Sequence, residues 1–334
     1  MKKILIIGTG GTIASKKHSL GLRPEIGIDE LIRLADIPRD KCHLEGITVM
    51  NIDSTNMTPS GWVTIANSIA EHYDHYDGFV VTHGTDTMAY TSAALTYILH
   101  KLNKPVIITG SQYPITEVHT DAIQNLTDAV YFAMENIKGV FICFDGDLIA
   151  GTRAIKVKTK SYDAFESVNF PVVAHIKHQK VQYDSRVLEQ FLPGEQPEPL
   201  EVWSDYNDRI LVIKLIPGMH PDIFDFIKAH YDGVIIESFG LGGIPDNEYN
   251  ISGKIRELIQ SGIVVVLTTQ CLEEGVEYGI YEVGSQLPRD KVIIAGDFNT
   301  ETLVAKTMIA MGTFKSIDEI KEYIETPYTV HHGG

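Results

Sequence analysis

The stretch Ile4-Leu5-Ile6-Ile7-Gly8-Thr9-Gly10-Gly11-Thr12-Ile13-Ala14 decides how the start of the chain folds. Its first four residues are a short apolar run that ends at a glycine, which predicts a buried strand. The glycines that follow let the backbone turn tightly and leave its N–H groups uncovered. Open α/β sheets bind their ligands at the carboxyl ends of the strands, where this loop is expected to lie. The Thr12 hydroxyl is therefore a candidate nucleophile, and the loop amides are candidate oxyanion donors.

Two other interpretations of this loop stay open at this point. A glycine-rich loop can cradle a nucleotide phosphate, but the pattern Gly8-x-Gly10-x-x-Ile13 lacks a third small residue. No Gly-Lys-Ser/Thr follows it either. The loop can also be a tight turn in which Thr12 caps a helix. The loop alone does not choose between these interpretations.

The order of strand, polar loop and helix recurs through the first part of the chain. Strands are expected at residues 4–7, 47–50, 78–82, 105–109 and 139–144. Helices are expected at residues 28–35, 59–73, 88–102 and 121–137. This alternation is typical of βαβ units and a parallel sheet. The loops at 8–14, 53–58, 82–87 and 110–112 each follow a strand, so we expect them to gather at one edge of the sheet.

After Phe144 the pattern changes. Asp145–Lys160 is short, mixed and basic, which predicts hairpin strands, and Leu192–Pro199 carries three prolines in eight residues, as in a semi-rigid linker. A second alternation follows, with strands near residues 209–215, 233–237, 262–268 and 292–295. The predicted fold class is α/β, with a larger N-terminal parallel-sheet domain and a smaller C-terminal α/β domain. The predicted boundaries are 1–190 for the catalytic domain, 191–208 for the linker and 209–334 for the second domain.

Composition limits the classes of partner. The 334 residues include 44 acidic and 28 basic side chains, a net charge of −16, which disfavours a nucleic-acid or anionic-membrane surface. No window approaches the roughly 20 apolar residues of a membrane helix. We expect a cytoplasmic protein with no nucleic-acid or membrane partner. The three cysteines, Cys42, Cys143 and Cys271, have no CxxC spacing and are expected to be buried, reduced thiols.

A second dense polar stretch is Thr82-His83-Gly84-Thr85-Asp86-Thr87-Met88. Thr85 and Asp86 lie at the start of a predicted helix, where both residue types also serve as ordinary caps. His83 is a candidate base, although a single loop histidine is more often structural. The chain has 13 histidines but no His-x-x-x-His pair backed by a carboxylate, so no metal site is expected.

Taken together, Thr9–Ala14 and Thr82–Met88 resemble the two signature motifs of the bacterial-type L-asparaginase/glutaminase family. Further stretches resemble the cytoplasmic, type I branch of that family: Asn51–Pro59, Gly110-Ser111-Gln112, Arg153–Lys156 and Thr269-Gln270-Cys271. The resemblance extends in order over nearly the whole chain. It implies a larger and a smaller α/β domain, hydrolysis of the side-chain amide of asparagine to aspartate and ammonia, no metal or cofactor, and a homodimer or homotetramer.

The resemblance also implies roles for individual residues. Thr12 matches the primary nucleophile, and Thr85, Asp86 and Lys156 match the second catalytic group. A threonine hydroxyl needs a group that removes its proton, and a lysine can do so when its surroundings tune it. The residues implied in substrate binding are Gly11, Ser54, Thr55, Gly84 and Ser111. Ser54 and Thr55 match the loop that holds the α-carboxylate, and the backbone of Ser111 helps place the amide. Without the resemblance, Lys156 would be interpreted as a solvated surface charge.

Four positions depart from the pattern of the family. Leu22 stands where many relatives have a lid tyrosine that contacts the nucleophile, and leucine cannot relay a proton. Gly243 stands where relatives often carry an asparagine that reaches the site of a neighbouring subunit. Ile155 and Glu237 replace the threonine and the arginine of an allosteric asparagine pocket found in some type I members. We therefore expect that this form of allosteric activation is absent.

Two alternatives to an asparaginase remain. An amino-acid-binding protein that kept the fold, or an enzyme with weak or altered activity, is favoured by Leu22 and disfavoured by the intact Thr12, Thr85, Asp86 and Lys156. An amidotransferase subunit that passes ammonia onward is disfavoured because that relative carries an N-terminal extension, whereas the first strand here begins near residue 3. Asparagine and glutamine both stay candidate substrates, since one methylene is worth only about 1–3 kcal/mol in a pocket.

Overall fold

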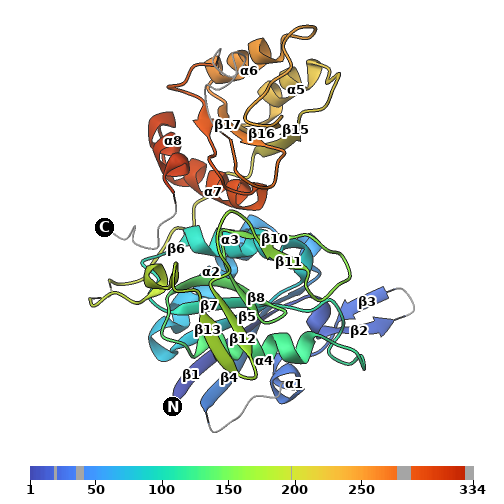
Figure 1. The fold of residues 1–334 in the computed structure, drawn as a ribbon, viewed down its shortest axis with the longest axis vertical. Helices are drawn as coiled ribbons and strands as arrows, with labels where there is room; N and C mark the ends of the chain where they lie inside the picture. Colours follow the sequence, from blue (N-terminus) through green and yellow to red (C-terminus); the bar gives the residue numbers. More distant parts are fainter. Residues whose placement is uncertain (19–20, 35–40, 197, 277–286, 328–334) are drawn as a thin grey trace. The chain divides into compact units, whose positions relative to one another are not determined.

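The computed structural model (Figure 1) describes residues 1–18, 21–34, 41–196, 198–276 and 287–327, without the side chains of residues 17–24. The chain divides into two compact units: residues 1–204 form the first, and the described residues from 205 onward form the second. Each unit has its own sheet and its own buried apolar cluster. The division falls later than the start of the predicted linker at residue 191.

The first unit is built on an eight-stranded sheet in the order β13-β12-β9-β8-β7-β5-β1-β4. Its strands are β1 (Lys2–Gly10), β4 (Cys42–Ile52), β5 (Gly78–Thr82), β7 (Pro105–Thr109), β8 (Gly139–Phe144), β9 (Asp147–Ala150), β12 (Ala174–Lys177) and β13 (Lys180–Tyr183). The five strands from β4 to β8 run parallel, as predicted. The other three extend the sheet antiparallel, because the tight turn Asp145-Gly146 leaves no room for a crossover helix after β8.

The central strands are buried on both faces, which explains why their sequences are continuous apolar runs. Helices α1 (Ile28–Leu34) and α4 (Ala122–Ala133) pack on the face that presents Ile4, Ile6 and Val80. Figure 1 shows α2 (Pro59–His72) and α3 (Met88–Ile98) on the opposite side of the sheet. The sheet therefore has helices on both sides, and its strand ends are free to carry loops.

The predicted helices form, with differences at their ends. Thr58 caps α2, and Pro59 occupies the first helical position, as the sequence predicts. Helix α3 ends at Ile98, earlier than the predicted residue 102, because Leu99 and His100 form strand β6 (Leu99–His100), which pairs with β14 (Glu201–Val202). Helix α4 ends at Ala133 and not near residue 137.

The segment after β8 contains the predicted hairpin strands, since β9 is antiparallel to β8 and β10 (Ala154–Lys156) pairs antiparallel with β11 (Phe165–Ser167). Part of the predicted linker, residues 191–208, packs within the first unit: Phe191 is buried against Phe141, and the Lys101 ammonium bridges Glu198 and Glu201. These contacts explain why the first unit extends to residue 204.

The second unit has a four-stranded parallel sheet, which agrees with the second predicted alternation. Its strands are β15 (Ile210–Lys214), β16 (Gly233–Ser238), β17 (Val264–Thr269) and β18 (Ile293–Ile294), and its helices are α5 (Asp222–His230), α6 (Ile251–Gln260), α7 (Thr300–Thr313) and α8 (Ile317–Glu325). Cys271, in the loop after β17, is exposed, so the prediction that all three thiols are buried is wrong for this one. Cys42 and Cys143 are buried as predicted.

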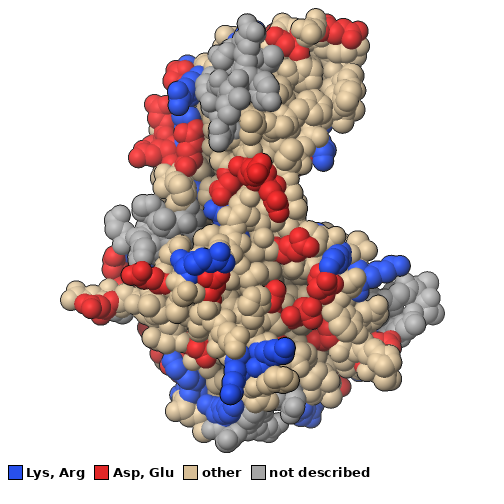
Figure 2. Space-filling model, in the orientation of Figure 1, with Lys and Arg blue, Asp and Glu red and all other residues tan. Residues whose placement is uncertain are grey.

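The surface is mixed in charge. Figure 2 shows Lys and Arg side chains of the visible face in separate small groups, between acidic and uncharged areas. No helix among the described residues is long and apolar enough to cross a membrane.

Asp128, buried in α4, gives a prediction on stability. Burial raises the pKa of its carboxyl to about 6, and the Gln124 amide that donates to it offsets only part of this. The folded protein therefore binds a proton that the unfolded chain releases between about pH 4 and pH 6, so the free energy of unfolding falls as pH rises through this window. Asp128→Asn keeps the acceptor for Gln124 and is expected to stabilise the protein by about 1–2 kcal/mol at pH 7. Urea unfolding at pH 4 and pH 7 checks this, and an equal effect at both pH values would contradict it.

Candidate active site

The loops that follow the central strands meet at one edge of the sheet, as predicted. A Cβ added to Gly11 would lie 2.4 Å from the Gly84 nitrogen, and one added to Gly110 would lie 2.2 Å from the His83 carbonyl oxygen. A Cβ added to Gly84 would lie 2.5 Å from Ser54 Oγ. Only glycines allow the loops after β1, β5 and β7 to pack this closely. The close packing places Thr12 and Thr85, each next to one of these glycines, in neighbouring loops.

Thr12 begins a 3-10 turn, Thr12–Ala14, after Gly10 and Gly11, whose φ angles are 105° and 79°. The turn is fixed by its backbone: the Gly11 N–H donates to the Ile52 carbonyl at 3.0 Å, and the Ser15 hydroxyl donates to the Gly11 carbonyl at 2.8 Å. Gly11 occupies the cap position of this turn, so the interpretation of Thr12 as a helix cap is wrong. Within the described residues, the half-buried Thr12 hydroxyl makes no hydrogen bond.

Thr85, Asp86 and Lys156 are in contact with one another, and we call them the threonine cluster. The Lys156 ammonium donates to Thr85 Oγ1 at 2.7 Å and to Asp86 Oδ1 at 2.6 Å. The Lys156 side chain is 17% exposed and that of Asp86 is 57% exposed. Strand β10, paired with β11, carries Lys156 to this place from 70 residues away, so Lys156 is not a solvated surface charge. Neither Thr85 nor Asp86 makes a side-chain capping bond at the 3-10 turn Thr85–Thr87.

The predicted carboxylate loop is anchored to the same edge. Ser54 is buried, and its carbonyl accepts a hydrogen bond from the Thr87 hydroxyl at 2.8 Å. Thr55 is exposed, and both its N–H and its hydroxyl donate to Asp53 Oδ1 at 2.9 Å. The structure thus places Ser54 against the Gly84 loop and turns the Thr55 hydroxyl toward Asp53.

The loop after β7 contributes backbone and one further side chain. The buried Ser111 hydroxyl donates to the Tyr113 carbonyl at 2.6 Å, so this hydroxyl is engaged within its own loop. Gln112 ends the Gly110-Ser111-Gln112 motif, and the sequence predicts no role for its side chain. Its Oε1 accepts from the Thr85 hydroxyl at 3.4 Å, and its Nε2 donates to the Ser161 carbonyl at 3.0 Å. Its place directly after a central strand is a sequence signal for a residue at the ligand-binding edge.

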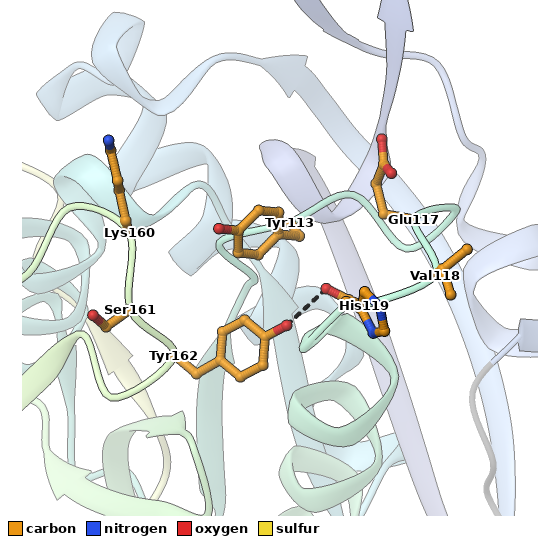
Figure 3. A pocket seen from close by; sticks show the side chains of 7 residues that line it. All are labelled: Tyr113, Glu117, Val118, His119, Lys160, Ser161 and Tyr162. Carbon is orange, nitrogen blue, oxygen red and sulfur yellow. Dashed lines mark hydrogen bonds between the residues drawn. The ribbon is translucent and has the colours of Figure 1, made fainter.

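Beside Gln112 lies an open hollow of about 660 Å³ (Figure 3). It is lined by Tyr113, Glu117, Val118, His119, Lys160, Ser161 and Tyr162. The Tyr162 hydroxyl donates to the His119 carbonyl at 2.7 Å, which joins the two segments that form its walls. The ring of Tyr113 meets the ring of Tyr162 edge-on at 5.8 Å. Ser161, which receives the Gln112 amide, belongs to this wall, so the hollow adjoins Gln112, whereas Thr12, Thr85, Asp86 and Lys156 do not line it.

His83 is fully buried and structural. Its Nδ1 donates to the Gly84 carbonyl at 2.7 Å, and its Nε2 accepts from the Thr91 hydroxyl at 2.9 Å. Burial lowers the pKa of the imidazole to about 4, and the Gly84 bond offsets this only in part. The neutral ring with both nitrogens engaged cannot serve as a base, so the structural interpretation of His83 is correct.

The same burial predicts a loss of stability in mild acid. Because the pKa of His83 in the folded state lies below the 6.5 of an unfolded histidine, its contribution is complete above pH 6.5 and is lost as pH falls toward 4. The loss amounts to about 3 kcal/mol over this window. His100 acts in the same direction and Asp128 in the opposite one, so the wild-type slope combines all three groups. His83→Asn is expected to flatten the pH dependence of the free energy of unfolding, and an unchanged slope would contradict the assignment.

The structure describes some of the side chains at the positions that depart from the family pattern. The side chain of Leu22 lies outside the described part of the structure. Gly243 pairs with Phe239 through two backbone hydrogen bonds in the second unit. Glu237 accepts from the Thr300 hydroxyl at 2.6 Å. Among the described residues, no three His, Cys, Asp or Glu side chains are placed to hold a metal ion.

The fold and the site together define a two-unit α/β protein with a threonine-lined site at the carboxyl ends of a parallel sheet. Residues 3–189 match the family "Asparaginase, N-terminal", and residues 209–324 match the "Glutaminase/Asparaginase C-terminal domain". The chain belongs to the asparaginase family.

Individual relatives agree with this assignment. The L-asparaginase of Thermococcus kodakarensis is 37% identical over 326 residues, which cover 97% of each chain. The solved structure of the thermostable L-asparaginase from Thermococcus kodakarensis matches with a TM-score of 0.88 and 36% identity, over 97% of each chain. L-asparaginase 1 of Escherichia coli K12 is 35% identical over 91% of this chain and 90% of its own. A glutamyl-tRNA(Gln) amidotransferase subunit of Methanosphaera stadtmanae is 33% identical over 97% of this chain and 75% of its own.

Proposed function

We propose that this protein hydrolyses the side-chain amide of L-asparagine to L-aspartate and ammonia. The observation that carries the proposal is the Lys156–Thr85–Asp86 cluster, packed beside the loop that presents Thr12, whose hydroxyl makes no hydrogen bond to any described residue. The relatives named L-asparaginase, which match nearly the whole chain, support the same substrate. The protein acts without a metal or other cofactor, because threonine, lysine and backbone donors supply the nucleophile, the proton transfer and the oxyanion contacts.

In this mechanism, the Thr12 hydroxyl attacks the amide carbon and forms an acyl-enzyme ester. The developing oxyanion is held by N–H groups of the loops, which lie at the first residues of two 3-10 turns and have no partner within those turns. The Thr12 proton leaves with ammonia. Water then attacks the ester carbon, and its proton passes through the Thr85 hydroxyl, which Lys156 holds, to the Thr12 oxygen as the ester C–O bond breaks. Thr12 is regenerated when aspartate leaves.

The charges of the amino acid determine how it lies in the site. The α-carboxylate is placed at Ser54 and Thr55, and the Ser111 backbone meets the amide. The Asp86 carboxylate is more than half exposed although it pairs with Lys156, so it has an oxygen left to accept the α-ammonium group. One carboxylate thus orients the lysine and binds the substrate.

The kinetics are expected to be hyperbolic. Ile155 and Glu237 cannot form the asparagine pocket that activates some type I relatives, and Glu237 is engaged by the Thr300 hydroxyl. Initial rates of ammonia release over a wide range of L-asparagine concentrations check this. Sigmoidal kinetics would contradict it, if substitutions at Cys271 and its surroundings abolish the sigmoidal shape.

The function is tested by measuring ammonia release from L-Asn, D-Asn and L-Gln by the purified protein. Release from L-Asn supports an asparaginase, and the ratio to L-Gln defines its selectivity. Saturable binding of L-Asn without release would instead support an amino-acid-binding protein. We place the protein in the cytoplasm as a homodimer or homotetramer, and light scattering at working concentrations measures the oligomeric state.

The amidotransferase alternative rests on the 33% identity to the amidotransferase subunit of Methanosphaera stadtmanae. In that case the ammonia would pass to a second active site on a partner protein. Co-purification with such a partner and tRNA, and hydrolysis that rises when both are added, would favour it. Full asparagine turnover by the chain alone would exclude a need for the partner.

A further inference from the structure

Asp121 stands at the position that should cap α4, yet it does not cap this helix. The Thr120 hydroxyl instead accepts the Ala122 N–H at 3.0 Å. The Asp121 carboxylate is turned the other way and is only 5% exposed. Aspartate at a helix start is usually explained by capping, so this carboxylate needs another explanation.

The carboxylate holds the loop after β7. Its Oδ2 accepts the Gln112 N–H at 2.9 Å, and its Oδ1 accepts the Tyr113 N–H at 3.0 Å. Two consecutive backbone donors bound to the two oxygens of one carboxylate fix the peptide plane between them. The direction in which the Gln112 side chain leaves the backbone is therefore set by Asp121.

A second buried side chain, Asn125, completes the support. Its Nδ2 donates to the Gly110 carbonyl at 3.0 Å and to Asp121 Oδ2 at 3.2 Å. Its Oδ1 accepts the Asp145 N–H at 3.0 Å, which ties the group to the turn after β8. Since Gly110 also packs against the His83 carbonyl, residues 110–113 are held on both sides.

The loop that is held in this way ends at the threonine cluster. Gln112 Oε1 meets the Thr85 hydroxyl at 3.4 Å, and the same hydroxyl accepts from Lys156 at 2.7 Å. A separation of 3.4 Å is near the outer limit of a hydrogen bond, so a small shift of the Gln112 backbone breaks this contact or shortens it. The Thr85 proton points to Gln112 in this state and must turn when it takes part in a transfer.

We propose that Asp121 is a positioning residue for the reaction: through the Gln112 and Tyr113 amides it aims the Gln112 carboxamide at Thr85 and so orients the Thr85 hydroxyl. This inference rests on the proposed hydrolysis of asparagine. It assigns a role in catalysis to a buried carboxylate that touches neither the substrate nor the reacting atoms. A purely structural carboxylate would instead affect the stability of the fold and leave the turnover of the folded enzyme unchanged.

The test uses Asp121→Asn in the full chain, with kcat and KM for L-asparagine. Asparagine keeps one acceptor oxygen but presents an NH₂ group to the second backbone N–H, so one of the two amide contacts is lost. We expect kcat to fall at least tenfold while KM changes less than threefold. Asp128→Asn is the matched control, because it changes a buried aspartate two turns further along α4 that does not contact the loop. Its kcat should match that of the wild type.

A second variant tests whether Asp121 acts through Gln112 on Thr85, and it keeps the test possible if Asp121→Asn does not fold. Gln112→Met keeps the length of the side chain and removes the contact with Thr85. We expect it to lose kcat to a similar degree, and the double variant to be no slower than the slower single variant, because both act through one contact. Multiplied losses in the double variant, or wild-type kcat in either single variant, would overturn the inference. Wild-type protein that releases no ammonia would overturn the proposed function, whereas active wild type with an active Asp121→Asn overturns the inference alone.

Discussion

Thr12→Ala is expected to lower kcat for L-asparagine at least several hundredfold, which corresponds to about 4 kcal/mol or more of activation free energy. The variant removes the hydroxyl that attacks the amide carbon, and no other described group near Gly11 replaces it. Binding of L-asparagine should persist, because the loops that hold its charged groups are unchanged. Ammonia release and calorimetric titration of the same preparation measure the two effects separately.

The structure makes this experiment easy to interpret. The Thr12 hydroxyl makes no hydrogen bond to any residue that the structure describes, and the turn is held by the backbone of Gly11. The free energy of unfolding of Thr12→Ala should therefore stay within about 1 kcal/mol of the wild type. Thr12→Ser is the control, since it restores a hydroxyl and should recover measurable turnover. Wild-type turnover in Thr12→Ala would reject Thr12 as the nucleophile.

Lys156→Met is expected to lower kcat by about 10²–10⁴-fold. Methionine keeps most of the apolar stem in its half-buried place, but it removes the donor to both Thr85 and Asp86. If Lys156 serves the hydrolysis of the acyl-enzyme, this step slows most, and the ester on Thr12 should accumulate. Intact-protein mass spectrometry after rapid quenching detects the ester, and its dependence on Thr12 is checked in the double variant.

Lys158→Met is the matched control for this experiment. Lys158 lies two residues further along the chain and pairs with Asp163 at the surface, where an ion pair contributes about 0–1 kcal/mol. Its side chain does not reach the threonine cluster, so kcat should stay near that of the wild type. Equal losses in both lysine variants would show that positive charge in this segment, and not the contact with Thr85, supports turnover.

The sequence alone determined much of the fold. The apolar runs of the central strands, their terminal glycines and the helices between them are local signals, and they predicted five parallel strands with their loops at one edge. The parallel order of the strands also predicted that four loops meet at this edge, before any contact between them was known. These are the loops at residues 8–14, 53–58, 82–87 and 110–112. The reason is that a buried parallel strand needs apolar side chains on both faces, and a loop that approaches another backbone closely needs glycine.

Only the tertiary structure decided which side chains meet. Lys156 and Thr85 are 71 residues apart, and the sequence around Lys156 is that of an exposed basic strand. Asp121 stands at the cap position of α4, yet its carboxylate holds the Gln112 loop. Helix α3 ends early because β14, far along the chain, pairs with Leu99 and His100. Periodicity and capping rules describe neighbours along the chain, whereas these contacts depend on how distant segments pack, so these rules could not find them. The grouping of Lys156 with Thr85 came from the family resemblance alone.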